Sequence, residues 1–314
     1  MLYGKYLFSC VFEDEAALPY YKGSTFRGVF GRALKNVVCA LKRKECSECL
    51  LKHKCIYYQV FETRTSAEES KDSRIASPPH PFIIEPPLYT ETNFQKGDFF
   101  DFQLLLFGQT NDYFPYFIYA FEQMGNIGIG KRINGKRAHF ILKDIKANRK
   151  KIYSHEDQIL RKGSFCQKLS LKHDGNLPKG SFQLRIVIET PLRLKFGNRL
   201  MADLPFHVLV RAMLRRLSSL FNYYGDGEPD LDYRGMVRRA QEDIRIVDSD
   251  LTWFDWRRYS NRQDQAMLMG GMVGSVIYEG MIGEYLPLIE FCSKVHLGKQ
   301  TSFGLGKIKA EMVK

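Results

Sequence analysis

The sequence lacks an uninterrupted apolar segment long enough to cross a bilayer. Its longest apolar stretch, residues 267–283, is interrupted by glycines and carries Glu279, which is typical of strands and turns. The apolar run over residues 6–12 is short and is followed by three acidic residues, unlike a secretory signal peptide. We therefore expect a cytoplasmic protein with no membrane partner.

The sequence also lacks the glycine motifs of the common nucleotide-binding proteins. Gly306-Lys307 is followed by Ile308, where the phosphate loop of nucleoside triphosphatases needs serine or threonine. The dinucleotide fingerprint Gly-x-Gly-x-x-Gly is not matched there, and the segment precedes a predicted strand instead of a helix. No strand has the RNP1 pattern of RNA-recognition motifs. These absences argue against three nucleotide- or RNA-binding classes.

Positive charge is in excess and unevenly distributed. The 314 residues include 47 Lys and Arg against 35 Asp and Glu, a formal net charge of +12. Residues 131–172 hold thirteen of the basic residues and only three acids, so this segment carries most of the surplus. Such a concentration favours a polyanionic partner, with nucleic acid as the first candidate. The alternative is a solvated basic face without a ligand.

Hydrophobic periodicity predicts an α+β protein in which one order of elements occurs twice. In the first half we expect strands over residues 5–13, 82–84, 98–107 and 137–145, with helices over 26–38 and 113–124. In the second half we expect strands over 181–189, 251–259, 267–278 and 303–312, with helices over 205–223 and 285–295. Arg211, Arg215 and Arg216 are predicted on the polar side of the helix over 205–223. Both orders are βαββαβ, the ferredoxin-like arrangement, which predicts two tandem domains over residues 1–175 and 176–314.

A repeated glycine pattern supports a duplication. Gly128-Ile129-Gly130-Lys131 and Gly304-Leu305-Gly306-Lys307 lie 176 residues apart, and both follow the second predicted helix of their half. The same offset superimposes the first predicted strand of each half. A chance match of two short glycine motifs is the alternative, and the agreement in register argues against it.

The second of these motifs ends a loop with the chemistry of a phosphate-binding site. Its candidate contact residues are Gly298, Lys299, Gln300, Thr301, Ser302, Gly304, Gly306 and Lys307. Glycines allow backbone amides to approach a phosphate, while hydroxyl groups and lysines add donors and charge. The alternative is a tight turn that joins a helix to a strand. The Lys-Gln-Thr-Ser run favours contact with an RNA backbone.

Three segments together resemble a known family. They are the loop over residues 298–307, the block Asp255-Trp-Arg-Arg-Tyr-Ser-Asn-Arg-Gln263, and Met269-Gly-Gly-Met-Val-Gly274. They resemble the C-terminal domain of CRISPR-associated pre-crRNA-processing endoribonucleases of the RAMP superfamily, and the likeness continues more weakly into the N-terminal half.

The resemblance implies an endoribonuclease that cleaves CRISPR repeat RNA without a metal cofactor. In that mechanism a 2′-hydroxyl attacks the adjacent phosphate, a general base and a general acid move the protons, and cations stabilise the phosphate. The product would be crRNA, and the enzyme would be able to remain in a CRISPR effector complex. The alternative is a RAMP subunit that binds crRNA without cutting it.

Two histidines are the candidates for acid–base catalysis, because imidazole titrates near neutral pH. His53 follows the first helix, where the family often carries its catalytic histidine, and the alternative is a solvent-facing loop residue. His296 borders the glycine-rich loop, and its alternative role is to fix the shape of that loop. Further candidate RNA contacts are Arg257, Arg258, Tyr259, Arg262, Lys131 and Arg132; strand-edge packing and surface ion pairs are the alternative for the group around Tyr259.

Four of the seven cysteines are close together in the sequence. Cys39, Cys46, Cys49 and Cys55 have the spacing C-x6-C-x2-C-x5-C, and four thiolates in this range suit a tetrahedral structural zinc. The alternative is a set of free thiols in a reducing compartment. A closed four-thiolate site would take no part in catalysis.

Overall fold

The computed structural model describes residues 1–42, 44–62, 78–171, 177–194, 203–260 and 265–313. The chain divides into two compact units, Met1–Lys168 and Leu169–Lys314. The boundary expected from the sequence, after residue 175, lies a few residues later along the chain.

The N-terminal unit has the βαββαβ order with small additions. Its strands are β1 (Leu2–Phe12), β2 (Ala16–Ala17), β3 (Phe82–Glu85), β4 (Asn93–Phe94), β5 (Phe99–Phe107), β6 (Ile129–Ile133), β7 (Lys136–Ala138), β8 (Phe140–Ala147), β9 (Lys150–Ser154) and β10 (Cys166–Lys168). Its helices are α1 (Gly23–Val38), α2 (Ile56–Phe61) and α3 (Phe114–Ile127), with short 3-10 turns at Cys46–Glu48, Lys52–Lys54 and Gly108–Tyr113. The main sheet is antiparallel with the order β3-β5-β1-β8-β9.

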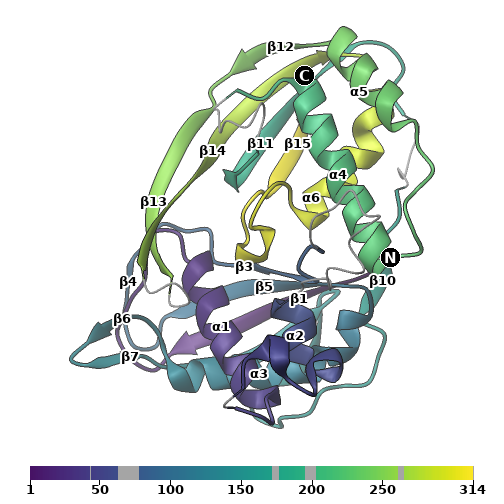
Figure 1. Ribbon diagram of the computed structural model, residues 1–314. Helices are drawn as coiled ribbons and strands as arrows, with labels where there is room; N and C mark the ends of the chain where they lie inside the picture. The colour runs from purple at the N-terminus through teal and green to yellow at the C-terminus, as the bar shows by residue number, and fades with distance from the viewer. Residues whose placement is uncertain (43, 63–77, 172–176, 195–202, 261–264, 314) are drawn as a thin grey trace. The chain divides into compact units, whose positions relative to one another are not determined.

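Phenylalanines form the core between this sheet and its helices. In β1 and β5 the rings of Phe8 and Phe102 stack with centroids 4.8 Å apart. Phe30 of α1 stacks on Phe121 of α3 at 4.4 Å, and Phe121 also lies 4.8 Å from Phe8. Figure 1 shows α1 and α3 together on one side of the sheet. Burial of these rings is the main stabilising contribution to the unit.

The C-terminal unit repeats the order. Its strands are β11 (Phe182–Leu192), β12 (Ile244–Ser249), β13 (Thr252–Ser260), β14 (Gln265–Gly280) and β15 (Ile308–Met312); its helices are α4 (Phe206–Tyr224), α5 (Tyr233–Glu242) and α6 (Leu286–Val295). The antiparallel sheet order is β12-β14-β11-β15. With the equivalent order β3-β5-β1-β8 in the first unit, this arrangement confirms the predicted α+β class and tandem ferredoxin-like fold.

The sequence analysis missed α5 and β12, which lie between the first helix and the long hairpin. β14 pairs with β12 over its second half and with β13 over its first half, and Figure 1 shows β12 and β13 following one another along β14. Five of the six β12 residues are exposed, so the buried–exposed alternation that identifies a strand is absent there.

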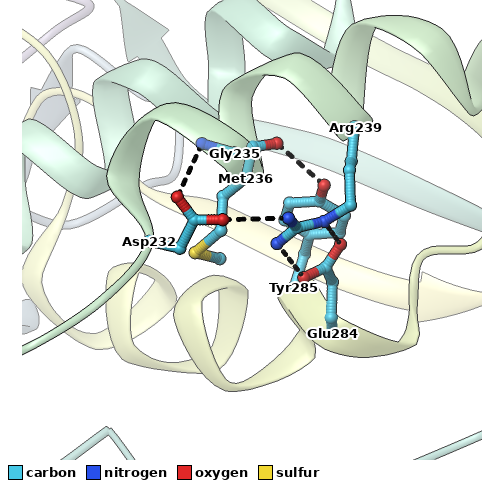
Figure 2. Close-up of polar contacts among 6 residues, drawn as sticks. All are labelled: Asp232, Gly235, Met236, Arg239, Glu284 and Tyr285. Carbon is cyan, nitrogen blue, oxygen red and sulfur yellow. Dashed lines mark hydrogen bonds and ion pairs between the residues drawn. The ribbon is translucent and has the colours of Figure 1, made fainter.

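An ion network attaches α5 to the short turn Gly283–Tyr285 that precedes α6 (Figure 2). The Asp232 carboxylate caps α5 by accepting from Gly235 N at 2.9 Å. Arg239 donates to Asp232 at 3.0 Å and to both oxygens of Glu284 at 2.9 and 2.8 Å. The Tyr285 hydroxyl donates to Met236 O at 2.9 Å. These contacts hold α5 near the start of α6, the helix that leads into the glycine-rich loop.

None of the helices within the described ranges has both the length and the apolar character that crossing a membrane requires.

Candidate nucleic-acid interface

The glycine-rich loop, residues 296–307, connects α6 to β15 in the C-terminal unit. It begins where His296 ends α6 with a positive φ of 57°. A single 3-10 turn, Thr301–Phe303, lies in its middle, between Gln300 and Gly304, which both have left-handed backbone conformations. The end of β11 lies beside this loop and supplies most of its anchoring contacts.

Backbone hydrogen bonds fix the loop against the end of β11. Lys299 N donates to Arg193 O at 3.0 Å and Gly306 N donates to Pro191 O at 3.1 Å. Across the base of the loop, Leu297 N donates to Gly306 O at 2.8 Å. The loop is therefore held by main-chain contacts at both ends.

Thr190 of β11 adds a side-chain anchor. Its hydroxyl donates to Gly304 O at 2.8 Å and accepts from Lys307 N at 2.8 Å. Thr190 is buried, so both bonds are shielded from water. One hydroxyl thus connects the two ends of the Gly304–Lys307 motif to the sheet.

Only the tip of the loop is open to solvent. Lys299 is exposed and its neighbours Gly298 and Gln300 are half-buried, whereas residues 301–306 are buried. The amides of residues 297, 299, 303, 304, 306 and 307 donate within the protein. Gly304, Gly306, Thr301 and Ser302 thus shape the loop from inside, and the groups best placed to meet a ligand are those at the tip.

Lysine and histidine side chains of the loop differ in accessibility. Lys307 is half-buried with its Nζ 3.6 Å from Glu189. His296 is completely buried and its Nδ1 lies 3.1 Å from Leu305 O. A buried imidazole cannot reach a substrate phosphate unless the loop rearranges. The placement of His296 favours the alternative role, that of fixing the loop.

Arg216 departs from the predicted polar face of α4, on which Arg211 and Arg215 are exposed as expected. Instead of facing solvent, it is buried and donates through Nε and Nη2 to Val295 O at 3.2 and 2.8 Å. Burial lowers the pKa of its guanidinium to about 10. A cation at the last carbonyl of α6 stabilises the C-terminus of that helix, so Arg216 supports the start of the glycine-rich loop.

The hairpin β13–β14 carries the Arg-Tyr block. Arg257, Arg258 and Tyr259 are in β13, opposite Leu268, Met267 and Ala266 of β14. Arg262 lies outside the described residues. The strand assignment agrees with the prediction, and the RNA contacts of these residues stay predictions.

The first Gly-x-Gly motif opens a hairpin in the N-terminal unit. Gly128 and Gly130 have φ values of 78° and 84°, close to the 81° and 76° of Gly304 and Gly306. The chain then forms β6 and β7 around a two-residue turn, Asn134-Gly135. An Asn-Gly pair between strands is a strong hairpin signal that the sequence analysis did not use. Lys131 and Arg132 are exposed on β6.

His53 lies in the short 3-10 turn Lys52–Lys54 and is exposed. Its carbonyl accepts from Gln59 Nε2 at 2.8 Å. Lys52 and Lys54 flank it in the same turn. The side chain is thus accessible to a ligand of the N-terminal unit, as acid–base chemistry requires.

The four clustered cysteines are free thiols and half-buried. Burial raises the pKa of Cys46, against the effect of Lys35, and Glu62, Cys39 and Cys55 raise it further. Over the parts of the chain that the structure describes, no three or more His, Cys, Asp or Glu side chains gather closely enough to hold a metal ion. As placed, the thiols do not form a zinc centre; structural zinc stays a prediction.

Sequence reasoning missed two residues at this interface, Thr190 and Arg193. Both lie where β11 ends, far along the chain from the loop that they contact. A pattern analysis gives little signal for them, because one is a threonine in an apolar strand and the other an isolated arginine. The duplication offset identifies β11 as a central strand but not the contacts at its end.

Two family models match the chain. Residues 1–165 match AF_1859_N, described as an N-terminal domain. Residues 186–308 match the model of the CRISPR-associated endoribonuclease Cas6. A protein of Archaeoglobus fulgidus, known only as an uncharacterized protein, is 26% identical over 296 residues, which cover 92% of this chain and 91% of that protein.

Solved structures share the fold at low sequence identity. A Cas6 product complex matches with a TM-score of 0.56 and 13% identity, over 98% of this chain and 100% of that one. A partial Cas6-RT-Cas1–Cas2 complex matches with a TM-score of 0.60 and 15% identity over 99% of this chain. This chain spans 46% of the length of that protein. The match to the Cas6 model confirms the resemblance of the C-terminal part to CRISPR-associated endoribonucleases.

Proposed function

We propose that this chain cuts CRISPR repeat RNA to crRNA by a metal-independent mechanism. The chain belongs to the AF_1859_N family and carries a Cas6 endoribonuclease domain in its C-terminal part. The match to the Cas6 model supports a CRISPR-related role in RNA processing. The substrate, the mechanism and the residues are our proposal.

One observation carries the proposal. The segment that matches Cas6, residues 186–308, includes the end of β11, the β13–β14 hairpin and the complete glycine-rich loop. These elements present an exposed lysine at a rigid loop tip, and the chain has a net charge of +12. Rigid cationic loops suit a sugar-phosphate backbone, which binds positively charged groups regardless of base sequence.

The reaction needs only proton transfer and charge stabilisation. The ribose 2′-oxygen attacks the adjacent phosphorus, a base takes the hydroxyl proton, and the bond to the 5′-oxygen breaks. The leaving oxygen accepts a proton, which gives a 2′,3′-cyclic phosphate and a 5′-hydroxyl product. We assign His53 as the acid–base candidate, since it is exposed and flanked by lysines.

A cleavage assay in EDTA tests the proposal. Synthetic CRISPR repeat RNA is incubated with the full chain, and products are analysed for the cyclic phosphate. We expect cleavage by the wild type and a loss of about 100-fold or more in His53→Ala, the usual contribution of a general acid or base. His155→Ala is the matched control, because His155 is also exposed in the same unit. Equal rates in both variants would refute the assignment of His53.

The second candidate function is a RAMP subunit that binds crRNA without cutting. The burial of His296 favours it, since it leaves one accessible histidine among the two predicted. Under this alternative, the wild type binds repeat RNA in a filter assay and yields no cleaved product with or without EDTA.

A further inference from the structure

Arg193 lies directly after β11, beside the tip of the glycine-rich loop. Its carbonyl accepts from Lys299 N at 3.0 Å. One guanidinium nitrogen, Nη1, lies 3.3 Å from Gln300 Oε1 and 3.3 Å from Met269 Sδ. The side chain is thus between the loop tip and the β13–β14 hairpin.

The guanidinium is half-buried and has no anionic partner among the residues that the structure describes. Arg193 forms no ion pair with any described carboxylate, and its Nε is buried without a hydrogen-bond acceptor. The Asp255 carboxylate acts electrostatically on the Arg193 guanidinium, but it accepts a hydrogen bond from Trp253 Nε1 at 2.8 Å. Burial lowers the pKa of Arg193, and Asp255 opposes this effect. A desolvated cation with an unsatisfied donor destabilises the free protein.

The loop does not need this side chain for its shape. Its anchors are the carbonyls of Pro191 and Arg193 and the Thr190 hydroxyl, none of which depends on a guanidinium. The contact of Nη1 with Gln300 Oε1 is long for a hydrogen bond, and the thioether sulfur of Met269 is a weak acceptor. A structural role therefore accounts poorly for a charged group at this position.

Neighbouring groups supply complementary donors. Gln300 accepts from Arg193 through Oε1, which leaves its amide NH₂ to donate. Lys299 is exposed and pairs with no described carboxylate. A guanidinium fork, an amide and an ammonium group are three donors that suit the oxygens of one phosphate diester.

We propose that Arg193, with Gln300 and Lys299, holds one backbone phosphate of RNA at the tip of the glycine-rich loop. The inference rests on the proposed function and names the phosphate-binding residue that the sequence motif does not contain. The phosphate supplies the anion that the half-buried guanidinium lacks among the described groups, so that affinity is gained at a position that costs stability in the free protein.

The test measures binding and stability together in the full chain. The probe is fluorescein-labelled repeat RNA with 2′-O-methyl riboses, which cannot undergo 2′-hydroxyl attack. For Arg193→Met we expect a Kd about tenfold higher and a slope of log K against log salt that is smaller by about 0.7, the value for one phosphate contact in a single strand. The melting temperature should equal or exceed that of the wild type, because an unpaired cation has been replaced by an apolar chain of similar length.

Arg245→Met is the matched control. Arg245 is an arginine of the same unit that pairs with Glu279 and whose side chain is 77% exposed, so the net charge changes equally. Equal affinities and slopes in the two variants would overturn the inference, as would a clear fall in the melting temperature of Arg193→Met, which would indicate a structural role. A wild type that binds no RNA would instead refute the proposed function.

Discussion

The two Gly-x-Gly motifs share positive φ angles but differ in ψ and in their surroundings. Each follows the last helix of its unit, α3 or α6. The φ values are 78° and 84° in the first motif and 81° and 76° in the second, but ψ is 155° at Gly128 and 10° at Gly304. In the C-terminal unit the motif is buried and fixed to β11 by Thr190 and Pro191. In the N-terminal unit Gly128 and Ile129 are also buried, and the motif leads into the β6–β7 hairpin, which carries the exposed Lys131 and Arg132.

This difference shows that a shared Gly-x-Gly sequence fixes neither the backbone path nor a binding role. One motif closes a rigid loop whose tip is accessible, and the other leads into a hairpin that carries exposed cations. The role of each copy depends on which neighbours cover it. Substitutions in each unit can separate the effect of the glycines from the effect of their surroundings.

The largest effect is expected from Gly306→Ala. A Cβ at Gly306 would lie 1.8 Å from Leu297 O, and φ is 76°, so both a clash with backbone and an unfavourable conformation arise. We expect a loss of at least about 3 kcal/mol in the free energy of unfolding. Gly130→Ala should cost less, about 2 kcal/mol, because the nearest atom, Ala17 O, is 2.5 Å away. Urea denaturation measures both; the reverse order would contradict the comparison.

Thr190→Val tests the side-chain anchor of the glycine-rich loop; in the first unit the Asp14 carboxylate accepts from His139 N at 3.0 Å, just before β8. Valine keeps the shape of threonine but removes the hydroxyl that donates to Gly304 O and accepts from Lys307 N. Both partners would be left unsatisfied in a buried place, so we expect a loss of about 2 kcal/mol. Thr190→Ser should restore most of it. A valine variant as stable as the wild type in chemical denaturation would show that the backbone contacts alone hold the loop.

Lys131→Gln with Arg132→Gln tests whether the projecting hairpin contributes to RNA binding. Both side chains are exposed, so the melting temperature should stay unchanged. The RNA affinity should fall a few-fold, with a salt slope smaller by up to about 1.4 if each cation contacts one phosphate. Lys42→Gln with Lys44→Gln, which removes two exposed charges of the same unit, controls for net charge. An equal effect of both pairs would show that only the net charge matters.

The smallest effect is expected from Arg239→Gln in the network of Figure 2. The hydrogen bond from Arg239 lowers the pKa of Glu284. The pKa of Asp232 is lowered mainly by the hydrogen bond from the Gly235 amide and to a smaller extent by the one from Arg239. Carboxylates with a lowered folded-state pKa stabilise the protein above their ordinary values of 4.5 and 3.8, and this contribution disappears as pH falls through the folded-state pKa. The melting temperature of the variant should be slightly below that of the wild type at neutral pH, and the difference should be small because the ion pairs are exposed. The difference in melting temperature should vanish in acid. A difference that persists in acid would show that Arg239 acts by packing.

The sequence by itself determined the order of the elements. Apolar alternation identified β1, β5, β11 and the β13–β14 hairpin, and the 176-residue offset identified the repeated unit, because a strand or helix records its buried face in its own local pattern. The same analysis missed β12, whose residues are mostly exposed, and the hairpin at Asn134-Gly135. The charge distribution and the loop composition indicated a polyanionic ligand, and the match to an endoribonuclease model is consistent with such a ligand.

Only the tertiary structure decided which polar residues of the interface reach solvent. His296, Thr301 and Ser302 are buried, Arg216 lies under the end of α6 instead of on a polar face, and Arg193 meets the loop from a strand more than 100 residues earlier in the chain. The reason is physical: burial depends on which element packs over a residue, and periodicity within one segment contains no information about its neighbours.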